Sequence, residues 1–435
     1  MSVTPPPIYS PPKQEANLKA DLTELKDALS QAAQAPAKPE IGKKHFNVEN
    51  PAPVNVFNYT GAVFDDDEEE YEHADLLPSF PEISFPPLGE IPFTDRGHFA
   101  NPEKANLYAE VATQGGSVKH HTPVLGVEFQ GVSLKDLSEK ALDDLALLIA
   151  EKGVVVFRKQ DNLSIEEQLR VGAYWGPLHL HPSTGVPRRA GLEHVHVVYA
   201  DKGARPDPTA FSKIELFHSD VTFEAQPPGP TLLRNLVTPD VGGDTIFSSG
   251  AAVYASLSPY FQKYLESLSA VHSGYEQAKG ARGAGQHVRR EPIETVHPVV
   301  RVHPVTGIKS VFFNAGFARR IVGVPKAESD NVMRFLNEQF ALNHDVTWRV
   351  KWNKDDVVIW DNRMVNHSAL FDFWPERRHA VRVTPHAERP ESVAAYEART
   401  GQKAKDWAEE RYKALGIQKP TLDGGVGRKE RGFKD

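Results

Sequence analysis

Between residues 138 and 390 the chain alternates between helical apolar spacing and short runs with strand character. Leucine and isoleucine recur at helical intervals from Ser138 to Lys152, which predicts an amphipathic helix. The run from Gly153 to Phe157 is apolar and β-branched, which predicts a buried strand directly after that helix. Ser164 and Glu167 have the spacing of a capping box, so a second helix is expected to run to Tyr174. These helices are expected to cover one face of a sheet.

Short strand patterns dominate from residue 231 onward, and two further helices interrupt them near Ser258 to Leu268 and Ser329 to Asn343. Many short strands favour a mainly β fold with flanking helices. The expected architecture is a double-stranded β-helix, the jelly-roll or cupin-like barrel, whose open mouth can hold a metal and small ligands. The predicted strands are Thr231–Val237, Thr245–Ser248, Val299–Val302, Val311–Asn314, Val346–Lys351, Asp356–Trp360 and Ala380–Thr384.

Residues 1–95 differ in composition from the rest of the chain. Prolines open this segment, a short helical pattern runs from Ala16 to Ala33, and Asp65 to Glu70 is an unbroken acidic block. Such a segment buries little apolar surface, so we expect a flexible extension with one short helix. The acidic block is typical of a solvated loop, with a basic partner as the alternative. The side chains expected to pack the extension on the following domain are Phe80, Phe85 and Phe93.

The pattern predicts one large domain over residues 96–390 and a charged helical tail over residues 391–435. The tail is expected to form one helix from Glu391 to Leu415 before a glycine-rich end. The segment from Glu276 to Glu291 is rich in glycine, lysine and arginine, which is typical of a lid loop that collects acidic substrates. An ordinary exposed connection explains its composition equally well.

Composition limits the classes of protein that fit. The chain has 435 residues, a hydrophobic content of 40% and a formal net charge of -8, which argues against nucleic acid or an anionic membrane as a partner. It has no cysteine, which excludes a disulfide framework and a thiolate metal site. We find no apolar run of about 18 residues and no signal region, so a cytoplasmic protein is expected. A homo-oligomer stays possible on this evidence.

The clearest chemical signal is the pair His218 and Asp220, followed far downstream by His367. Residues two apart in a strand share a face, so the first two side chains are able to hold one ion while the third arrives from another strand. Two histidines and one carboxylate form the facial triad of non-haem Fe(II) oxygenases. A chain with 18 histidines contains such a pair by chance, so its surroundings decide the interpretation.

Two arginines follow in the predicted strand that begins after the triad. Arg378 and Arg382 are four positions apart and therefore lie on the same face. Two guanidinium groups directed into one interior need anions, and their planar forks fit carboxylates and sulfonates. The pair therefore predicts two anions near the metal, unless one arginine faces solvent at a sheet edge.

These features resemble the taurine dioxygenase family of Fe(II)/2-oxoglutarate-dependent dioxygenases, and within it the fungal sulfonate dioxygenases. The resemblance covers roughly Val124 to Pro390. It is carried by a series of motifs in the same order: Trp175–Pro182, His218–Phe223, Gly242–Thr245, His297–Pro304, Phe313–Phe317, Trp360–His367, and Arg378 with Arg382.

The resemblance assigns roles to individual residues. It implies that His218, Asp220 and His367 bind Fe(II), and that Arg378 and Thr245 bind the far carboxylate of the cosubstrate 2-oxoglutarate. It implies that Arg382 binds the sulfonate of the substrate, in a pocket lined by His181, Val221 and Phe317. Ile214 departs from the family, which has a polar asparagine four residues before the first ligand, so a sulfonate is expected more firmly than taurine itself. His297 and His303 are read as structural.

The implied reaction hydroxylates the carbon next to sulfur and releases sulfite and an aldehyde, with succinate and CO2, at the expense of O2. A zinc hydrolase is disfavoured because the chain has no H-E-x-x-H motif or comparable general base. A non-catalytic metal-binding cupin would not need both arginines. Within the enzyme class, an alkyl sulfate, an aryloxyacetate or xanthine stays open as the substrate.

Overall fold

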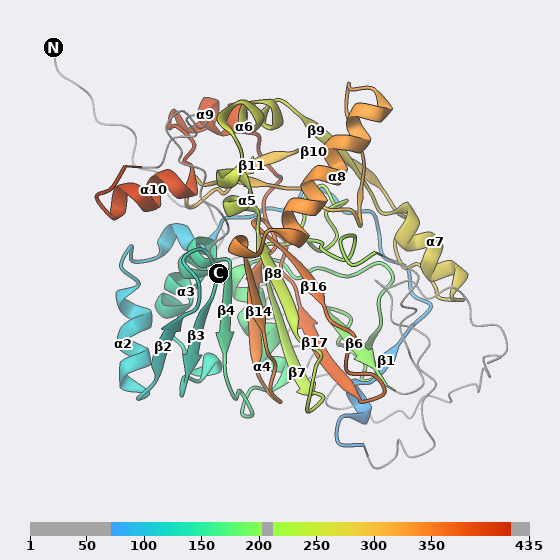
Figure 1. Cartoon of the computed structure of the whole chain (residues 1–435). Coiled ribbons are helices and arrows are strands. Elements are labelled where there is room, and N and C mark those ends of the chain that lie inside the picture. The colour runs from blue at the N-terminus through green and yellow to red at the C-terminus, as the bar shows by residue number, and fades with distance from the viewer. Residues whose placement is uncertain (1–70, 202–211, 419–435) are drawn as a thin grey trace, which may run out of the picture.

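The computed structural model describes residues 71–201 and 212–418, and a seven-stranded sheet is its largest element (Figure 1). Among the neighbouring strands of this sheet, only β3 and β4 run parallel to each other. In spatial order the strands are β2 (Ser117–His120), β3 (Val127–Gln130), β4 (Val154–Phe157), β15 (Val357–Asp361), β7 (Pro230–Val237), β17 (Arg378–Val383) and β6 (Val195–Ala200).

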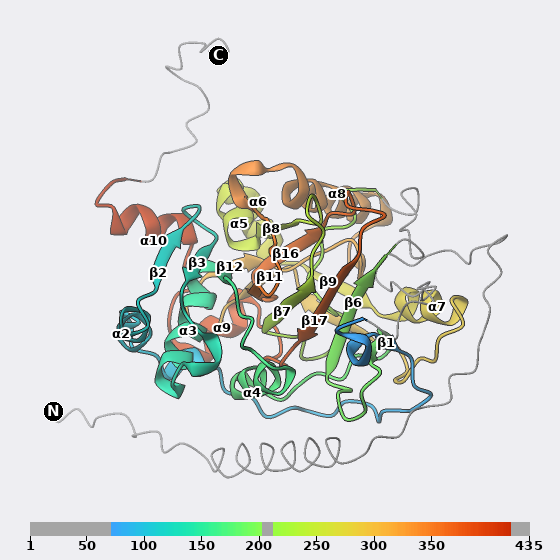
Figure 2. The same cartoon turned by 90° about the horizontal axis from the view of Figure 1, so that it is seen from below.

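A second sheet of three strands lies against one face of the first. Its spatial order is β14 (Thr347–Val350), β8 (Thr245–Ser249) and β16 (Val365–Ala369). Leu233 and Val358 of the large sheet share one buried cluster with Phe247 and Val365 of the small sheet. Figure 2 shows β8 and β16 on one side of β7 and β17. The space between the two sheets therefore holds the main core, and its open end holds the site described below.

Helices cover the outer face of the large sheet, as the apolar spacing predicted. The predicted ones are α3 (Glu139–Lys152) and α4 (Ile165–Trp175), and α2 (Ala105–Thr113), which was not predicted, packs beside α3. Leu142 and Leu145 of α3 pack in a buried cluster with Phe157 of β4. The Ser164 hydroxyl accepts from the backbone N–H of Glu167, and the Glu167 side chain accepts from the N–H of Ser164. The predicted capping box is confirmed, and α4 begins where it was expected.

The remaining elements lie around the small sheet. They include α5 (Gly250–Ser256), α6 (Pro259–Glu266) and α8 (Lys326–Leu342). The shorter sheets are β10 (Glu294–Pro298), β9 (Ser269–Ser273) and β13 (Ala318–Ile321) in that order, and the pair β11 (Val300–Val302) and β12 (Lys309–Val311). Among the described residues, no helix combines the length and apolar character needed to cross a membrane.

Besides the strand expected at Asp220, which is described with the site, three predictions about local structure were wrong. The strand expected at Val311–Asn314 is β12, which ends at Val311. The expected lid loop contains the helix α7 (Tyr275–Gly283), and the two arginines that follow it are buried. The tail is not one helix, because Gly401 at φ 67° ends α9 (Val393–Thr400) and Asp406 caps a new helix, α10 (Trp407–Ala414).

The described part of the predicted extension, residues 71–95, packs on the large sheet. Its short strand β1 (Pro78–Ser79) pairs with β5 (Val186–Pro187), and Leu77 packs with Val197 and Tyr199 of β6. We call residues 77–93 the strap. The helix expected at Ala16–Ala33 and the acidic block lie outside the described residues. The boundaries 1–95, 96–390 and 391–435 stay predictions.

Candidate active site

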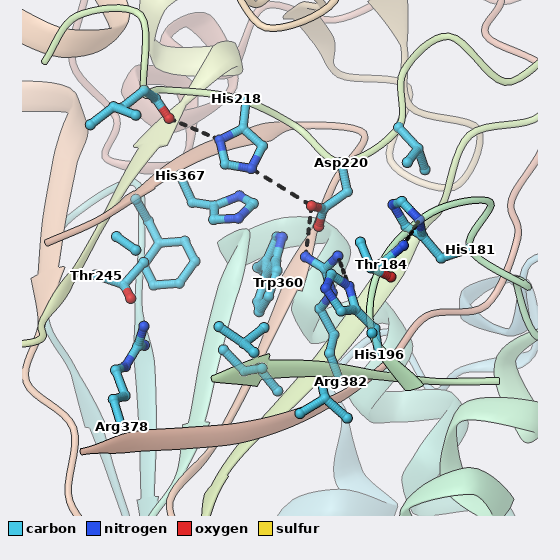
Figure 3. A pocket seen from close by; sticks show the side chains of 18 of the residues that line it. His181, Thr184, His196, His218, Asp220, Thr245, Trp360, His367, Arg378 and Arg382 are labelled. Atoms are coloured by element: carbon cyan, nitrogen blue, oxygen red, sulfur yellow. Dashed lines mark hydrogen bonds and ion pairs between the residues drawn. The ribbon is translucent and has the colours of Figure 1, made fainter. Parts of the chain in front are cut away.

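His218, Asp220 and His367 meet at the open end of the space between the sheets (Figure 3). Their ligand atoms all lie within 4.8 Å of one another. His367 lies in β16, and the backbone of His218 pairs with it. The N–H of His218 donates to the His367 carbonyl at 3.0 Å, and the N–H of His367 donates back at 2.8 Å. The backbone thus brings two side chains together that are far apart in the sequence.

The side chain of Asp220 points to the same place, but its backbone conformation differs from the predicted one. The pair was expected on a regular strand, but only His218 makes a strand-like bridge, and Asp220 lies in a turn. The backbone of the next residue, Val221, has φ 38°, a region that β-branched residues rarely adopt. Strain of this kind is typical of functional sites, where the surrounding structure holds it in place. The turn, and not the alternation of side chains along a strand, therefore directs the Asp220 side chain toward the same point as that of His218.

Backbone and side-chain groups nearby hold the segment from His218 to Asp220 in place. The Leu216 carbonyl lies 2.8 Å from Nδ1 of His218, which leaves Nε2 to face the other two groups. The Ser219 hydroxyl donates to the Val365 carbonyl at 3.0 Å. The N–H of Asp220 donates to Oδ1 of Asn362 at 3.2 Å. The string from Trp360 to His367 thus supplies one predicted ligand and part of the support for the other two.

The electrostatic surroundings suit a divalent metal. Burial opposes ionisation of Asp220, but the guanidinium of Arg382 and the two imidazoles together hold the pKa of Asp220 below its usual range. Burial, together with the nearby His218, lowers the pKa of His367 to about 3, so its imidazole is neutral at physiological pH. Oδ2 of Asp220 is buried and has no hydrogen-bond partner among the described residues. A carboxylate and two neutral imidazoles with an unused buried oxygen fit a metal ligand set.

Arg378 lies at one end of the cavity, next to Thr245 and Trp352. The guanidinium carbon of Arg378 is 5.7 Å from the centre of the Trp352 ring. The indole N–H of Trp352 donates to the hydroxyl of Thr245 at 3.0 Å. Since a hydroxyl can accept and donate at once, Thr245 keeps its own hydrogen for an anion. This end can therefore bind an anion through a guanidinium and a hydroxyl.

Arg382 lies at the other end and is paired with two groups of the protein. Its Nη1 donates to Oδ1 of Asp220 at 2.7 Å, and its Nη2 contacts Nδ1 of His196. His181 lies beside His196, with ring centres 5.3 Å apart, and its Nδ1 accepts from two backbone N–H groups. Burial and the nearby positive charges keep the pKa of both histidines well below the usual value. Each is neutral with its proton on Nε2, so each can donate one hydrogen bond.

All nine predicted site residues line this one cavity. They are His181, His218, Asp220, Val221, Thr245, Phe317, His367, Arg378 and Arg382. Ile214 is half-buried and is not among the described residues that line it. His297 and His303 are buried elsewhere, with Nε2 of His303 bonded to Asp361 at 3.0 Å and Nε2 of His297 to the Glu224 carbonyl at 2.9 Å.

The sequence analysis missed four polar lining residues, Thr184, His196, Trp352 and Gln277. His196 lies in β6, whose sequence Val-His-Val-Val-Tyr-Ala alternates enough to have been predicted as a strand. Gln277 lies in α7, which was taken for a loop. Trp352 follows β14 without any pattern that marks it.

Comparison with known proteins identifies the family. Residues 117–384 match the family described as taurine catabolism dioxygenase TauD, TfdA family. This chain belongs to that family. An alpha-ketoglutarate-dependent sulfonate dioxygenase of Saccharomyces cerevisiae is 38% identical over 334 residues, which cover 74% of this chain and 79% of the relative. The chain is therefore a dioxygenase that depends on alpha-ketoglutarate, which is 2-oxoglutarate.

Other relatives widen the range of substrates within the family. An alpha-ketoglutarate-dependent sulfate ester dioxygenase of Pseudomonas putida is 31% identical over 290 residues, covering 64% of this chain and 92% of that protein. The crystal structure of a taurine dioxygenase from Burkholderia xenovorans matches with a TM-score of 0.54 and 27% identity, covering 64% of this chain and 94% of that one. Membership of the family establishes the reaction class, and the substrate has to be inferred from the residues of the site.

Proposed function

We propose that this dioxygenase hydroxylates the carbon next to sulfur in a small organosulfonate. The observation that carries the proposal is the placement of two arginines of one strand, Arg378 and Arg382, in the cavity that holds the His218, Asp220 and His367 cluster. One arginine binds the anionic cosubstrate, and the other binds an anionic substrate. The sulfonate dioxygenase of Saccharomyces cerevisiae supports the same choice.

We propose that the two facing sheets form the double-stranded β-helix barrel and that residues 96–390 make up the catalytic unit. The shared core of Phe247 and Val358 supports this arrangement, since each comes from a different sheet. The barrel supports function by bringing β8, β16 and β17 around one opening.

We propose Fe(II) as the metal, held by Nε2 of His218, by Asp220 and by His367. Imidazole and carboxylate ligands suit iron, and an ion held by these three side chains would stay accessible to the cosubstrate and to oxygen. Fe(II) with 2-oxoglutarate and O2 supplies the oxidising step, in which 2-oxoglutarate becomes succinate and CO2 and one oxygen atom enters a C–H bond.

The protein's own residues bind and orient the two anions. Arg378 and the Thr245 hydroxyl hold the far carboxylate of 2-oxoglutarate, which fixes its other end toward the metal ligands. Arg382 and the Nε2–H of His181 hold the sulfonate, so that the adjacent carbon faces the metal. Val221 and Phe317 pack on the carbon chain and exclude water. Placing both reactants in this way supplies much of the catalytic advantage.

The product of hydroxylation decomposes without further catalysis. A carbon that bears both hydroxyl and sulfonate breaks its C–S bond as the hydroxyl loses its proton, which gives an aldehyde and sulfite. The overall balance is one sulfonate, one 2-oxoglutarate and one O2 converted to aldehyde, sulfite, succinate and CO2.

A sulfate ester is the second candidate, because it presents the same tetrahedral monoanion to Arg382 and the relative from Pseudomonas putida acts in that class by name. Aryloxyacetate and xanthine remain further alternatives. The expectation that Ile214 disfavours taurine stays a prediction from the resemblance, because Ile214 is not among the described residues that line the cavity.

A panel of anions tests the proposal directly. Purified protein loaded with Fe(II) is assayed with taurine, butanesulfonate, octyl sulfate, an aryloxyacetate and xanthine, while succinate and sulfite are measured together. Equal amounts of succinate and sulfite from a sulfonate are expected. Succinate without sulfite, obtained only with another anion of the panel, would reassign the substrate.

A further inference from the structure

Another buried arginine, Arg289, lies behind the end of the cavity that contains Arg382. It is 2% exposed, and within the described part of the chain its guanidinium donates to carbonyl groups and not to a carboxylate. The carbonyl of His181 accepts from its Nη2 at 2.9 Å, and the carbonyl of Thr184 accepts from the same nitrogen. By contrast, the neighbouring Arg290 pairs with Glu224 at 2.9 Å. Glu193 attracts this guanidinium electrostatically but is not hydrogen-bonded to it, and burying a guanidinium without a directly bonded acid is costly, so Arg289 calls for an explanation.

The hydrogen bonds that Arg289 donates all reach the loop that carries His181. Besides the guanidinium contacts, the backbone N–H of Arg289 donates to the Pro182 carbonyl at 2.7 Å. The same loop sets the ring of His181, because the N–H groups of Ser183 and Thr184 both donate to its Nδ1 at 3.2 Å. A shift of this loop therefore turns the His181 ring and moves the Nε2–H that faces the cavity.

The strap holds Arg289 from the opposite side. The N–H of Phe85 donates to the Arg289 carbonyl at 2.6 Å, and the Phe85 ring centre lies 5.8 Å from the Arg289 guanidinium and 5.9 Å from that of Arg290. Aromatic faces stabilise cations at such distances. The strap thus offsets part of the cost of burying this charge.

The strap is anchored on both sides of Phe85. The Ser79 hydroxyl donates to the Val186 carbonyl at 3.1 Å. Ile91 exchanges two hydrogen bonds of 2.8 Å with the side chain of Gln226. Gly185, which lines the cavity, leaves no room for a side chain, since a Cβ there would lie 2.7 Å from Cβ of Pro78. The strap also precedes residues 117–384, so it lies outside the part of the chain that defines the family.

We propose that Arg289 is a positioning residue for substrate binding, held by the strap, that fixes the loop from His181 to Thr184 so that His181 reaches the substrate anion. This inference rests on the proposed function only in naming the anion as a sulfonate. Arg378 lies at the other end of the cavity, beside Trp352, so the two ligands of the enzyme should respond differently.

Arg289→Gln tests the proposal, with Arg282→Gln as the matched control. Arg282 lies in α7, is 50% exposed and pairs with the exposed Glu291, so its loss should change nothing. With butanesulfonate varied, Arg289→Gln should lower kcat/KM by up to roughly 100-fold, the scale of a displaced binding group. The KM for 2-oxoglutarate should not change. Arg289→Lys keeps the charge and should fall between the wild type and the glutamine variant.

Two further measurements test the role of the strap and the mobility of the His181 loop. Phe85→Leu keeps an apolar side chain but removes the aromatic face, and it should raise the KM for butanesulfonate, whereas Ile83→Ala at an exposed strap position should not. Hydrogen exchange of residues 181–187 should be faster in Arg289→Gln than in wild type or Arg282→Gln. Circular dichroism establishes that each variant is folded.

The results separate this inference from the proposed function. If the wild type releases sulfite from no sulfonate, the proposed function fails, and the positioning role is then decided by hydrogen exchange of residues 181–187 alone. A folded Arg289→Gln with unchanged exchange in that loop, or with equal increases in the KM for both ligands, overturns the positioning role. So does a Phe85→Leu variant that is indistinguishable from Ile83→Ala.

Discussion

The two ends of the cavity use the same residue type from the same strand in different ways. Arg378 lies beside the Trp352 ring, and its neighbour Thr245 accepts a hydrogen bond from that indole. Arg382, four positions along β17, is tied to Asp220 and to His196. Residues four apart in a strand are separated by about 13 Å, so each guanidinium meets its own surroundings.

The difference shows how one strand can serve two ligands. At the Arg378 end the guanidinium lies beside an indole ring and a hydroxyl, where the far carboxylate of 2-oxoglutarate is proposed to bind. At the Arg382 end the protein supplies a carboxylate of its own, and Asp220 is also a proposed metal ligand. Binding of substrate at Arg382 is therefore coupled to the metal site through Asp220, whereas Arg378 lies at the other end of the cavity beside Trp352.

Replacing Asp220 should have the largest effect because this residue belongs to the metal cluster and to the Arg382 end together. Asp220→Ala is expected to abolish turnover, since it removes a metal ligand and leaves Arg382 without its acid. Succinate formation and bound iron are measured against wild type, with the exposed Asp240→Ala as control. Undiminished activity, or activity with zinc alone, would contradict the assignment of the metal.

Exchanging the arginines for alanine separates the two ends. Charge-assisted contacts to a buried anion contribute about 1.5–3 kcal/mol, so each loss should weaken one ligand by roughly 10- to 150-fold. Arg378→Ala should raise the KM for 2-oxoglutarate, and Arg382→Ala chiefly that for the sulfonate. Initial rates with each ligand varied in turn decide the result.

The lysine variants sharpen this test. A point charge cannot reproduce the planar fork, so Arg378→Lys and Arg382→Lys should restore binding only in part. Because Arg382 also pairs with Asp220, Arg382→Ala should weaken iron binding as well, and Arg378→Ala should not. The two-anion arrangement is wrong if both alanine variants lose the same ligand.

Thr245→Val removes a single hydroxyl at the Arg378 end while keeping the shape of the side chain. One hydrogen bond to a charged group contributes on the order of 1.5 kcal/mol or more, so the KM for 2-oxoglutarate should rise roughly tenfold. The KM for the sulfonate should stay the same. A matching rise for both ligands would mean that Thr245 acts on the site as a whole.

The smallest effect is expected from His196, which contacts Arg382 and not the reacting groups. His196→Ala removes the acceptor for Nη2 of Arg382, and a typical hydrogen bond contributes about 0.5–1.5 kcal/mol, so the KM for the sulfonate should rise roughly two- to thirteenfold. His196→Asn retains an acceptor and should recover part of the loss. Rescue by asparagine distinguishes positioning of Arg382 from a general packing defect.

The sequence predicted those site residues whose chemistry follows directly from the type of side chain. The two arginines were placed on one face by counting along a strand, and both line the cavity. Helices α3 and α4 were predicted because their caps and apolar spacing are local signals. The roles of the cavity residues came from the resemblance, since no local rule relates His367 to a turn 147 positions earlier.

The errors also have physical causes. Strand alternation gave a wrong reason for the direction of Asp220, because the positive φ of Val221 depends on the surrounding fold and not on a residue preference. Arg289 was read as part of an exposed basic loop, since its burial depends on carbonyls at residues 181 and 184 and on Phe85, far away in the sequence. Composition describes average behaviour, and a buried arginine held by main-chain groups is an exception to it.

The paired backbones of His218 and His367 have a consequence for the unloaded protein. Two of the three proposed ligands are held by main-chain hydrogen bonds of 2.8 and 3.0 Å, and not by the ion itself. The conformational entropy of bringing them together is therefore lost during folding, before any metal arrives. Unlike a zinc finger, whose chain is unfolded without metal, this protein should keep its fold under chelation and lose only its chemistry. Because the site forms before the metal binds, the metal can be removed and added again without unfolding the chain. The supply of metal, and not the synthesis of new chains, can therefore determine how much of the protein is active.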